Sequence, residues 1–114
     1  MVRDDSMRPT LVPGDRLYVD PRPSRELGRG DLVVVRDPER PDRSLVKRVG
    51  AMAGDATDLG RTLPEGTVFL VGDNAMASRD SRQFGPVDRQ QVLGVVWFRY
   101  APPHRRGPLG GTFK

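Results

Sequence analysis

Five short stretches of the chain carry its apolar residues in patterns typical of β-strands, either alternating with polar residues or running together. They are residues 16–20, 32–36, 45–52, 67–72 and 92–100. Turn-rich segments separate them, and Pro13-Gly14 is placed for a type II turn. Single helical turns are predicted at 24–27 and 88–92. The pattern predicts one mainly β domain with little helix, built as a small, partly open barrel or a sandwich.

The composition narrows the chemistry that this domain can carry. A chain of 114 residues suffices for one small core, and its 13 Gly and 11 Pro agree with many turns. The chain has no cysteine, which excludes disulfides and Cys-ligated metals. Its one histidine, His104, lies in a Pro/Arg-rich segment, so neither a Ser-His-Asp triad nor a His-based metal site is expected. We therefore expect no metal and no cofactor.

Charge and hydropathy bear on partners and location. The net charge of +4 comes from dispersed arginines without interleaved aromatics, so no nucleic-acid partner is predicted. No apolar run approaches the roughly 20 residues of a membrane span, and there is no signal peptide. The expected location stays open between the cytoplasm and a membrane surface. Residues 1–100 are predicted to form the functional domain, and the Pro/Gly/Arg-rich tail 101–114 is predicted to be disordered.

Lysine usage singles out one position. The chain contains 17 arginines but only two lysines, Lys47 and the terminal Lys114. Alternation along an extended strand puts Leu45, Val49 and Ala51 on the face of Lys47, and Val46 and Arg48 on the other face. Burial lowers the pKa of a lysine, whereas an arginine stays protonated. Lys47 is therefore a candidate for an amine that loses its proton, and a surface lysine at a strand end is the alternative.

Two further segments offer partners for such an amine. Ser6 precedes Pro9, which fixes the backbone, and a serine on a rigid connection is a nucleophile if a base deprotonates it. Without a usable histidine, a neutral lysine is the natural base. Residues 72–87 begin with a Gly-Asp-Asn turn and contain Ser78, and an extended backbone would pair Asp80 with Arg82. A turn serine and a capped loop are the purely structural alternatives.

The three segments together resemble the type I signal peptidase family, whose members use a Ser/Lys dyad. The matching motifs, in the same order, are SMRPT at 6–10, KRV at 47–49, GDN at 72–74 and SRDSR at 78–82, with Gly85 after them. The resemblance covers about residues 4–99. It implies a small signal-peptidase-like β domain and a serine endopeptidase.

The resemblance also implies a role for each matched residue. Ser6 would be the nucleophile and its N–H an oxyanion donor; Lys47 would be the general base and Ser78 would orient it; Asp80 and Arg82 would be a structural pair; Met7 would line the substrate cleft. The partner would be a precursor protein or leader peptide with small residues before the cut, bound beside a strand edge. The resemblance leaves peripheral contact with a membrane as a further possible interaction.

Two departures from the family pattern bear on activity. Members usually carry membrane-spanning helices before the serine, whereas five residues precede Ser6, which indicates a truncation or a different start. Asp4 stands where some relatives have a hydroxyl that completes the oxyanion hole. An ionised carboxylate there would repel the oxyanion and lower activity if it lies close.

The substrate prediction has two branches. Residues 77–87 and 96–99 resemble most the small nickel-type superoxide dismutase maturation proteases, which cut a short leader from one precursor. The expected function is thus removal of a leader or signal peptide, either from exported proteins in general or from one dedicated precursor. A non-catalytic binding module that kept the fold is the alternative. The self-cleaving repressors of the SOS response share the Ser/Lys pair but lack the segment at 72–82.

Overall fold

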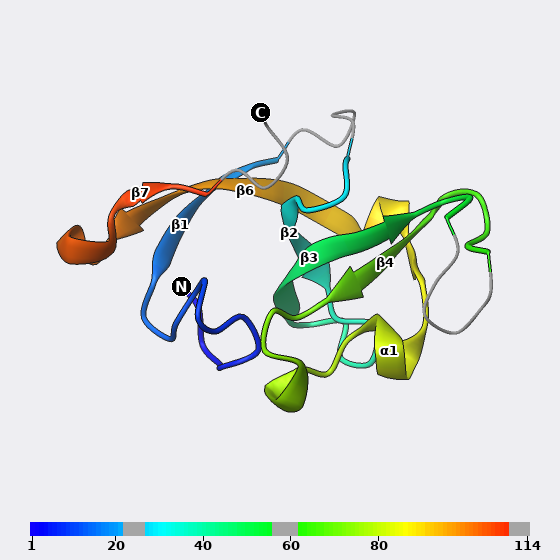
Figure 1. Cartoon of the computed structure of the whole chain (residues 1–114), viewed down its shortest axis with the longest axis horizontal. Helices are drawn as coiled ribbons and strands as arrows, with labels where there is room; N and C mark the ends of the chain where they lie inside the picture. The colour runs from blue at the N-terminus through cyan, green and yellow to red at the C-terminus, as the bar shows by residue number, and fades with distance from the viewer. Residues whose placement is uncertain (22–26, 56–61, 110–114) are drawn as a thin grey trace.

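The computed structural model describes residues 1–21, 27–55 and 62–109 and shows one antiparallel sheet (Figure 1). Its seven strands are β1 Arg16–Asp20, β2 Leu32–Arg36, β3 Ser44–Met52, β4 Thr67–Val71, β5 Val87–Asp88, β6 Val92–Ala101 and β7 Gly107–Pro108. Along the sheet the order is β1-β6-β2-β3-β4-β5, and β7 pairs with β6. The sheet does not close into a barrel. The predicted mainly β class is confirmed.

Helix is confined to short pieces between strands: η1 Ala75–Ala77, α1 Ser81–Phe84, η2 Arg89–Gln91 and η3 Pro103–Arg105. None of the helices in the described residues is long and apolar enough to cross a membrane. The turn expected at 88–92 is present as η2. Most of the one expected at 24–27 lies outside the described residues. The five predicted strands are present with ends within one residue of those expected, because local patterns determine them.

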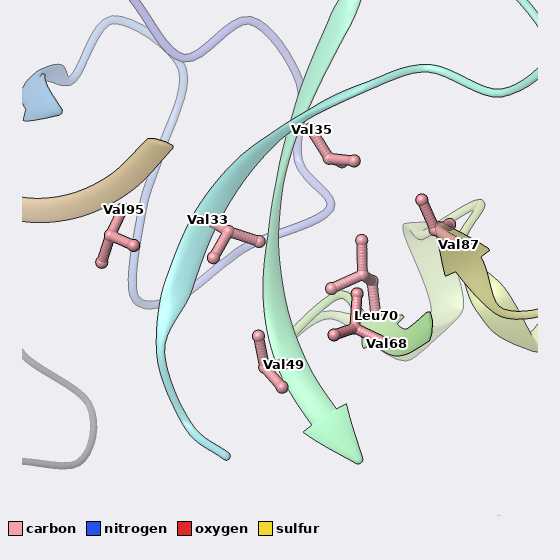
Figure 2. Close-up of a cluster of buried hydrophobic side chains, with 7 residues drawn as sticks. All are labelled: Val33, Val35, Val49, Val68, Leu70, Val87 and Val95. Carbon is pink, nitrogen blue, oxygen red and sulfur yellow. The ribbon is translucent and has the colours of Figure 1, made fainter. Parts of the chain in front are cut away.

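The apolar run of β2 is buried on both faces of the sheet, which explains why it does not alternate. Val33 and Val35 belong to a cluster with Val49 and Leu70, drawn in Figure 2. On the other face, a second cluster joins strand residues to the N-terminal segment; it contains Val2, Met7, Leu11, Leu32 and Val96. The N-terminal segment is thereby fixed against the sheet.

Strand β3 follows the expected alternation only up to Gly50. Lys47 and Leu45 lie opposite Val33 and Val35 of β2, on the face of the first cluster. The pairing with β4 is irregular between Val49 and Ala51.

Beyond this irregularity the side chains change faces. Ala51 pairs with Phe69 and packs in a separate cluster with it, while Met52 packs against the first cluster. The expectation that Ala51 shares the face of Lys47 is therefore wrong, because a β-bulge adds one residue and shifts the alternation.

The segment after residue 100 also differs from the expected disordered tail, over residues 101–109. Gly107 pairs with Arg99 of β6, and Leu109 N–H donates to Trp97 O at 3.0 Å. Arg99 and Arg105 both donate to the buried carboxylate of Asp15. Together these groups lower the Asp15 pKa even though burial opposes the shift. Composition indicated a solvated tail, but ion pairing and strand addition order this part of it.

Candidate active site

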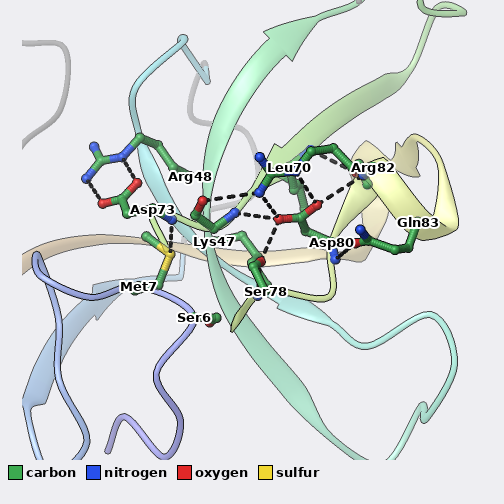
Figure 3. A network of polar contacts seen from close by, with 12 residues as sticks. Ser6, Met7, Lys47, Arg48, Leu70, Asp73, Ser78, Asp80, Arg82 and Gln83 are labelled. Atoms are coloured by element: carbon green, nitrogen blue, oxygen red, sulfur yellow. Dashed lines mark hydrogen bonds and ion pairs between the residues drawn. The ribbon is translucent and has the colours of Figure 1, made fainter. Parts of the chain in front are cut away.

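The three motif segments meet at the end of β4, and one carboxylate joins them. Asp73 accepts two hydrogen bonds from the Arg48 guanidinium, both at 2.8 Å (Figure 3). It accepts another from Thr10 Oγ1 at 2.6 Å. Its pKa is lowered, against the effect of burial, by these hydrogen bonds. Arg48 belongs to β3 and Thr10 to the N-terminal segment, so Asp73 ties both to the β4 end. The one signal for this role of Asp73 in the sequence was its place in the Gly-Asp-Asn turn.

Ser6 is brought to the same place by backbone contacts. Its carbonyl oxygen accepts a hydrogen bond from Asn74 N–H at 2.8 Å. A methyl group at Gly72 would lie 2.6 Å from that oxygen and 2.2 Å from Ser78 Oγ. Only glycine leaves room for this approach. The Ser6 side chain is 4% exposed, so the hydroxyl is held in the protein and not on its surface.

Lys47 reaches this point from β3 and is 2% exposed. Its Nζ donates a hydrogen bond to Ser78 Oγ at 3.1 Å. Burial lowers the pKa of Lys47, and the charges of Asp4 and Asp80 oppose that shift. The dominant cause is the loss of hydration of the ammonium form. The amine is therefore easier to deprotonate than a surface lysine.

A chain of hydrogen bonds determines how Ser78 meets the amine. The Ser78 hydroxyl donates to Asp80 Oδ2 at 2.5 Å, so its oxygen presents a lone pair to Lys47 Nζ. Asp80 is fully buried and also accepts from Gly72 N–H at 2.8 Å and from Arg82 Nη2 at 2.7 Å. Burial raises the Asp80 pKa, but the hydrogen bonds from Arg82 and Ser78 outweigh it and hold the pKa well below its usual range. Asp80 thus remains an acceptor.

The predicted Asp80–Arg82 pair forms, but the backbone conformation of this segment differs from the expected extended one. Asp80 is the N-cap of helix α1, and Arg82 lies in the first turn. The Asp80 carboxylate accepts from Arg82 N–H, while Gln83 Oε1 accepts from Asp80 N–H. The expectation of an extended backbone here is wrong. The Asp-x-x-Gln spacing is a capping box and was the signal for this helix.

The described structure has no hydrogen bond between the side chains of Ser6 and Lys47. The Ser6 hydroxyl donates instead to Asp4 Oδ1 at 2.9 Å, and Ser6 N–H donates to the same oxygen at 3.1 Å. Asp4 therefore lies close to Ser6, which is the condition under which its carboxylate should lower activity. In Figure 3 Ser6 lies at the edge of the polar network, and its carbonyl oxygen and Ser78 Oγ both lie close to Gly72.

A cavity of about 770 Å³ opens next to Ser6. Its lining comes from the N-terminal segment, from β1 and β2, and from the start of β3 with the loop before it. Met7 is one of the lining residues, and its sulfur accepts from Asp73 N–H at 3.4 Å. Within the described parts of the chain, no group of three His, Cys, Asp or Glu side chains is arranged to hold a metal ion.

The open β sheet and the buried lysine–serine network define the class to which the chain belongs. A model of the family described as "Signal peptidase, peptidase S26" matches residues 1–59 and 56–101. The chain therefore belongs to this family and is a peptidase. The family predicted from the motifs is confirmed.

Two mitochondrial inner membrane protease subunits and one probable signal peptidase are similar to the chain. The mitochondrial ATP-independent inner membrane protease subunit 1b of Arabidopsis thaliana is 40% identical, over 94% of this chain and 72% of that protein. The mitochondrial inner membrane protease subunit 1 of Xenopus tropicalis is 33% identical, over 91% of this chain and 69% of that protein. The probable signal peptidase I-1 of Synechocystis sp. is 29% identical, over 96% of this chain and 74% of that protein. The resemblance to nickel superoxide dismutase maturation proteases stays a prediction.

Proposed function

We propose that this peptidase is a serine endopeptidase that uses a Ser6/Lys47 dyad to remove a leader or signal peptide from a precursor protein. The observation that carries the proposal is the buried Lys47 amine, hydrogen-bonded to Ser78 beside Ser6. Because Ser78 donates its own proton to Asp80, it takes an N–H from the amine. A neutral amine fixed in this way keeps its lone pair for another proton.

The proposed reaction runs in two halves. Ser6 Oγ bonds to the carbonyl carbon of the substrate while Lys47 Nζ takes the hydroxyl proton, and Ser6 N–H donates to the oxyanion. The lysine gives this proton to the leaving amine as the C–N bond breaks. Water then adds to the acyl carbon and loses a proton to Lys47. That proton returns to Ser6 Oγ when the ester bond breaks.

The substrate would bind as an extended strand. Strand β4 pairs with β3 only from Arg48 to Met52, so Ser44–Lys47 has no ladder partner on that side among the described strands. Residues of this free edge also line the cavity next to Ser6. A peptide added along such an edge gains backbone hydrogen bonds and presents alternate side chains to pockets. Small residues before the cut would let its carbonyl approach the buried Ser6.

The physiological substrate lies between two candidates: signal peptides in general, and one dedicated precursor such as that of nickel superoxide dismutase. The named relatives include both a probable signal peptidase and inner membrane proteases.

We further propose peripheral membrane contact. Tyr18, Trp97 and Tyr100 form an exposed, stacked group on β1 and β6, and such rings favour a membrane interface.

The test is mass spectrometry of precursor peptides incubated with the wild type, Ser6→Ala and Lys47→Ala. We expect the wild type to cut after a small residue and both variants to lose at least 1000-fold in kcat/KM, since the dyad acts as a unit. Thr67→Ala removes a hydroxyl at the far end of β4 and should retain activity. Activity that survives Lys47→Ala would exclude the dyad.

The choice of peptides separates the remaining possibilities. A signal peptide of an exported protein and a nickel superoxide dismutase precursor would be compared at equal concentration. Cleavage of one and not the other decides between the two branches. A non-catalytic binding module is favoured by one observation, the hydrogen bonds that engage Ser6 with Asp4. That module would bind the peptides and leave them intact.

A further inference from the structure

We infer that Asp4 is an inhibitory residue that engages the two reactive groups of Ser6 and must be displaced by the substrate. The inference rests on the proposed Ser6/Lys47 chemistry and adds a control on it. One carboxylate oxygen, Asp4 Oδ1, accepts from Ser6 Oγ at 2.9 Å and from Ser6 N–H at 3.1 Å. The first group is the proposed nucleophile and the second the proposed oxyanion donor. The arrangement occupies both at once.

The hydrogen-bond directions explain why this contact opposes catalysis. To react, the Ser6 hydroxyl must donate its proton to Lys47, but in this structure it donates to Asp4. The Lys47 amine in turn bonds to Ser78 and not to Ser6. An ionised carboxylate only accepts hydrogen bonds, so it cannot stabilise an oxyanion, and its charge repels one at this distance. Asp4 therefore has to leave before the substrate carbonyl can take its place.

The opposite role, Asp4 as the general base for Ser6, is chemically weaker. A carboxylate binds a proton far less strongly than a neutral amine, and proton transfer is most efficient when the base has a pKa near the working pH. Lys47 is the buried group whose pKa is lowered from its usual high value. The two roles make opposite predictions for removal of Asp4.

The surroundings of Asp4 permit its displacement. The residue is exposed and lines the cavity next to Ser6, where the substrate is proposed to bind. Its hydrogen bonds in the described structure are the two to Ser6. The adjacent Asp5 is different, since it pairs with Arg8 and does not line the cavity. A rotation of the Asp4 side chain toward solvent thus frees Ser6 without breaking another hydrogen bond of the described structure.

Asp4 also acts on Lys47 through its charge. Four charged groups influence the amine in addition to its burial: Asp4 and Asp80 raise its pKa, whereas Arg79 and Arg82 lower it. Removal of the Asp4 charge should therefore lower the Lys47 pKa further.

The experiment compares wild type, Asp4→Ala and Asp4→Asn, with Asp5→Ala as the matched control. We expect both Asp4 variants to raise kcat/KM for a leader peptide by about tenfold, which corresponds to about 1.4 kcal/mol. Asp4→Asn should gain at least as much as Asp4→Ala, because its amide is able to donate to an oxyanion. The rising limb of the pH profile should move to lower pH in both, and Asp5→Ala should match the wild type.

A second readout is independent of turnover. Because the chain has only two lysines, NMR can follow the titration of the Lys47 side chain with Lys114 as the other signal. We expect Asp4→Asn to lower the titration midpoint of Lys47, and Asp5→Ala to leave it unchanged. Circular dichroism checks that the variants keep the fold.

The outcomes separate the inference from the proposed function. Cleavage by the wild type with no gain, or a loss, in Asp4→Ala would overturn the inhibitory role and leave the peptidase intact. An unchanged Lys47 midpoint in Asp4→Asn would also count against it. Absence of cleavage by the wild type and by every variant would overturn both proposals. Cleavage by the Asp4 variants alone would support both.

Discussion

At the scale of single residues, the chain uses its two kinds of basic side chain for different purposes. Arginine is found where a charge-assisted hydrogen bond holds a carboxylate, as in Arg48 with Asp73 and Arg82 with Asp80. Lysine is found at 47, where the amine is buried and donates to Ser78 but to no carboxylate in the described structure. The guanidinium stays protonated, while the amine is able to lose its proton. The rarity of lysine is thus consistent with a specialised position.

This burial predicts how stability depends on pH. The folded protein lowers the Lys47 pKa below its ordinary value of 10.5, so it binds fewer protons than the unfolded chain between the two pKa values. The free energy of unfolding should therefore rise with pH across that window. Lys47→Met removes this pH dependence, and its free energy of unfolding should exceed that of the wild type by about 1 kcal/mol or more at pH 6. Urea unfolding at a series of pH values measures the free energy of unfolding of both proteins.

The control for this prediction is Lys47→Arg, which keeps the charge but does not lose it in the same window. We expect it to be destabilised over the whole range, since a larger cation is forced into a site that is 2% exposed. Parallel pH curves for the wild type and Lys47→Met would contradict the assigned pKa direction.

At the scale of elements, the end of β4 is the position where backbone spacing determines the site. Gly72 lies between Ser78 and Ser6, and its own N–H donates to Asp80. Gly72→Ala would place a methyl group 2.2 Å from Ser78 Oγ, so Ser78 and Ser6 must move apart. We expect a loss of about 1–3 kcal/mol in stability and a loss of at least tenfold in kcat/KM.

A matched glycine is available as the control. At Gly107 in β7 an added methyl group meets nothing within 4 Å, so Gly107→Ala should leave both quantities unchanged. Denaturant unfolding and peptide cleavage are measured on the same preparations. If Gly72→Ala cleaved as fast as the wild type, the close approach of Ser6 and Ser78 would not be needed for catalysis.

At the scale of the whole molecule, the candidate site and the exposed aromatic group lie on different strands of the sheet. Strands β3 and β4 carry the site, while β1 and β6 lie at the other end of the strand order (Figure 1). These two strands carry the stacked aromatic group, with Tyr18 4.6 Å from Tyr100 and 5.7 Å from Trp97 between ring centroids. Trp97 is 52% exposed. Proposed membrane contact through this group would leave the free edge of β3 open to a precursor.

We therefore expect Trp97→Ser to weaken co-sedimentation with vesicles that contain anionic lipid by about fivefold, since binding scales with the buried apolar area. Leu93→Ser alters another exposed apolar residue of β6, outside the aromatic group, and should have a smaller effect. Equal binding by the wild type and both variants would rule out this surface as the contact.

Local patterns predicted most of the fold. The strands were predictable because the alternation and runs of apolar residues follow from the backbone period. The bulge at Gly50 and the ordering of residues 101–109 were not, since a bulge depends on the partner strand and the tail on Asp15, which lies far away in sequence. Helix α1 had a local signal, the Asp80–Gln83 capping box.

The sequence by itself determined the strand pattern and the family, and it supplied the prediction that Ser6, Lys47 and Ser78 carry the chemistry. Only the tertiary structure decided how they meet, because the bonds to Asp73 join segments that are 25 and 63 residues apart and Gly72 leaves room for Ser6 and Ser78 to approach. It also decided the direction of each hydrogen bond. Ser78 presents a lone pair to Lys47 because its hydroxyl donates a hydrogen bond to Asp80. Ser6 is held by Asp4, a contact that no pattern of residues specifies.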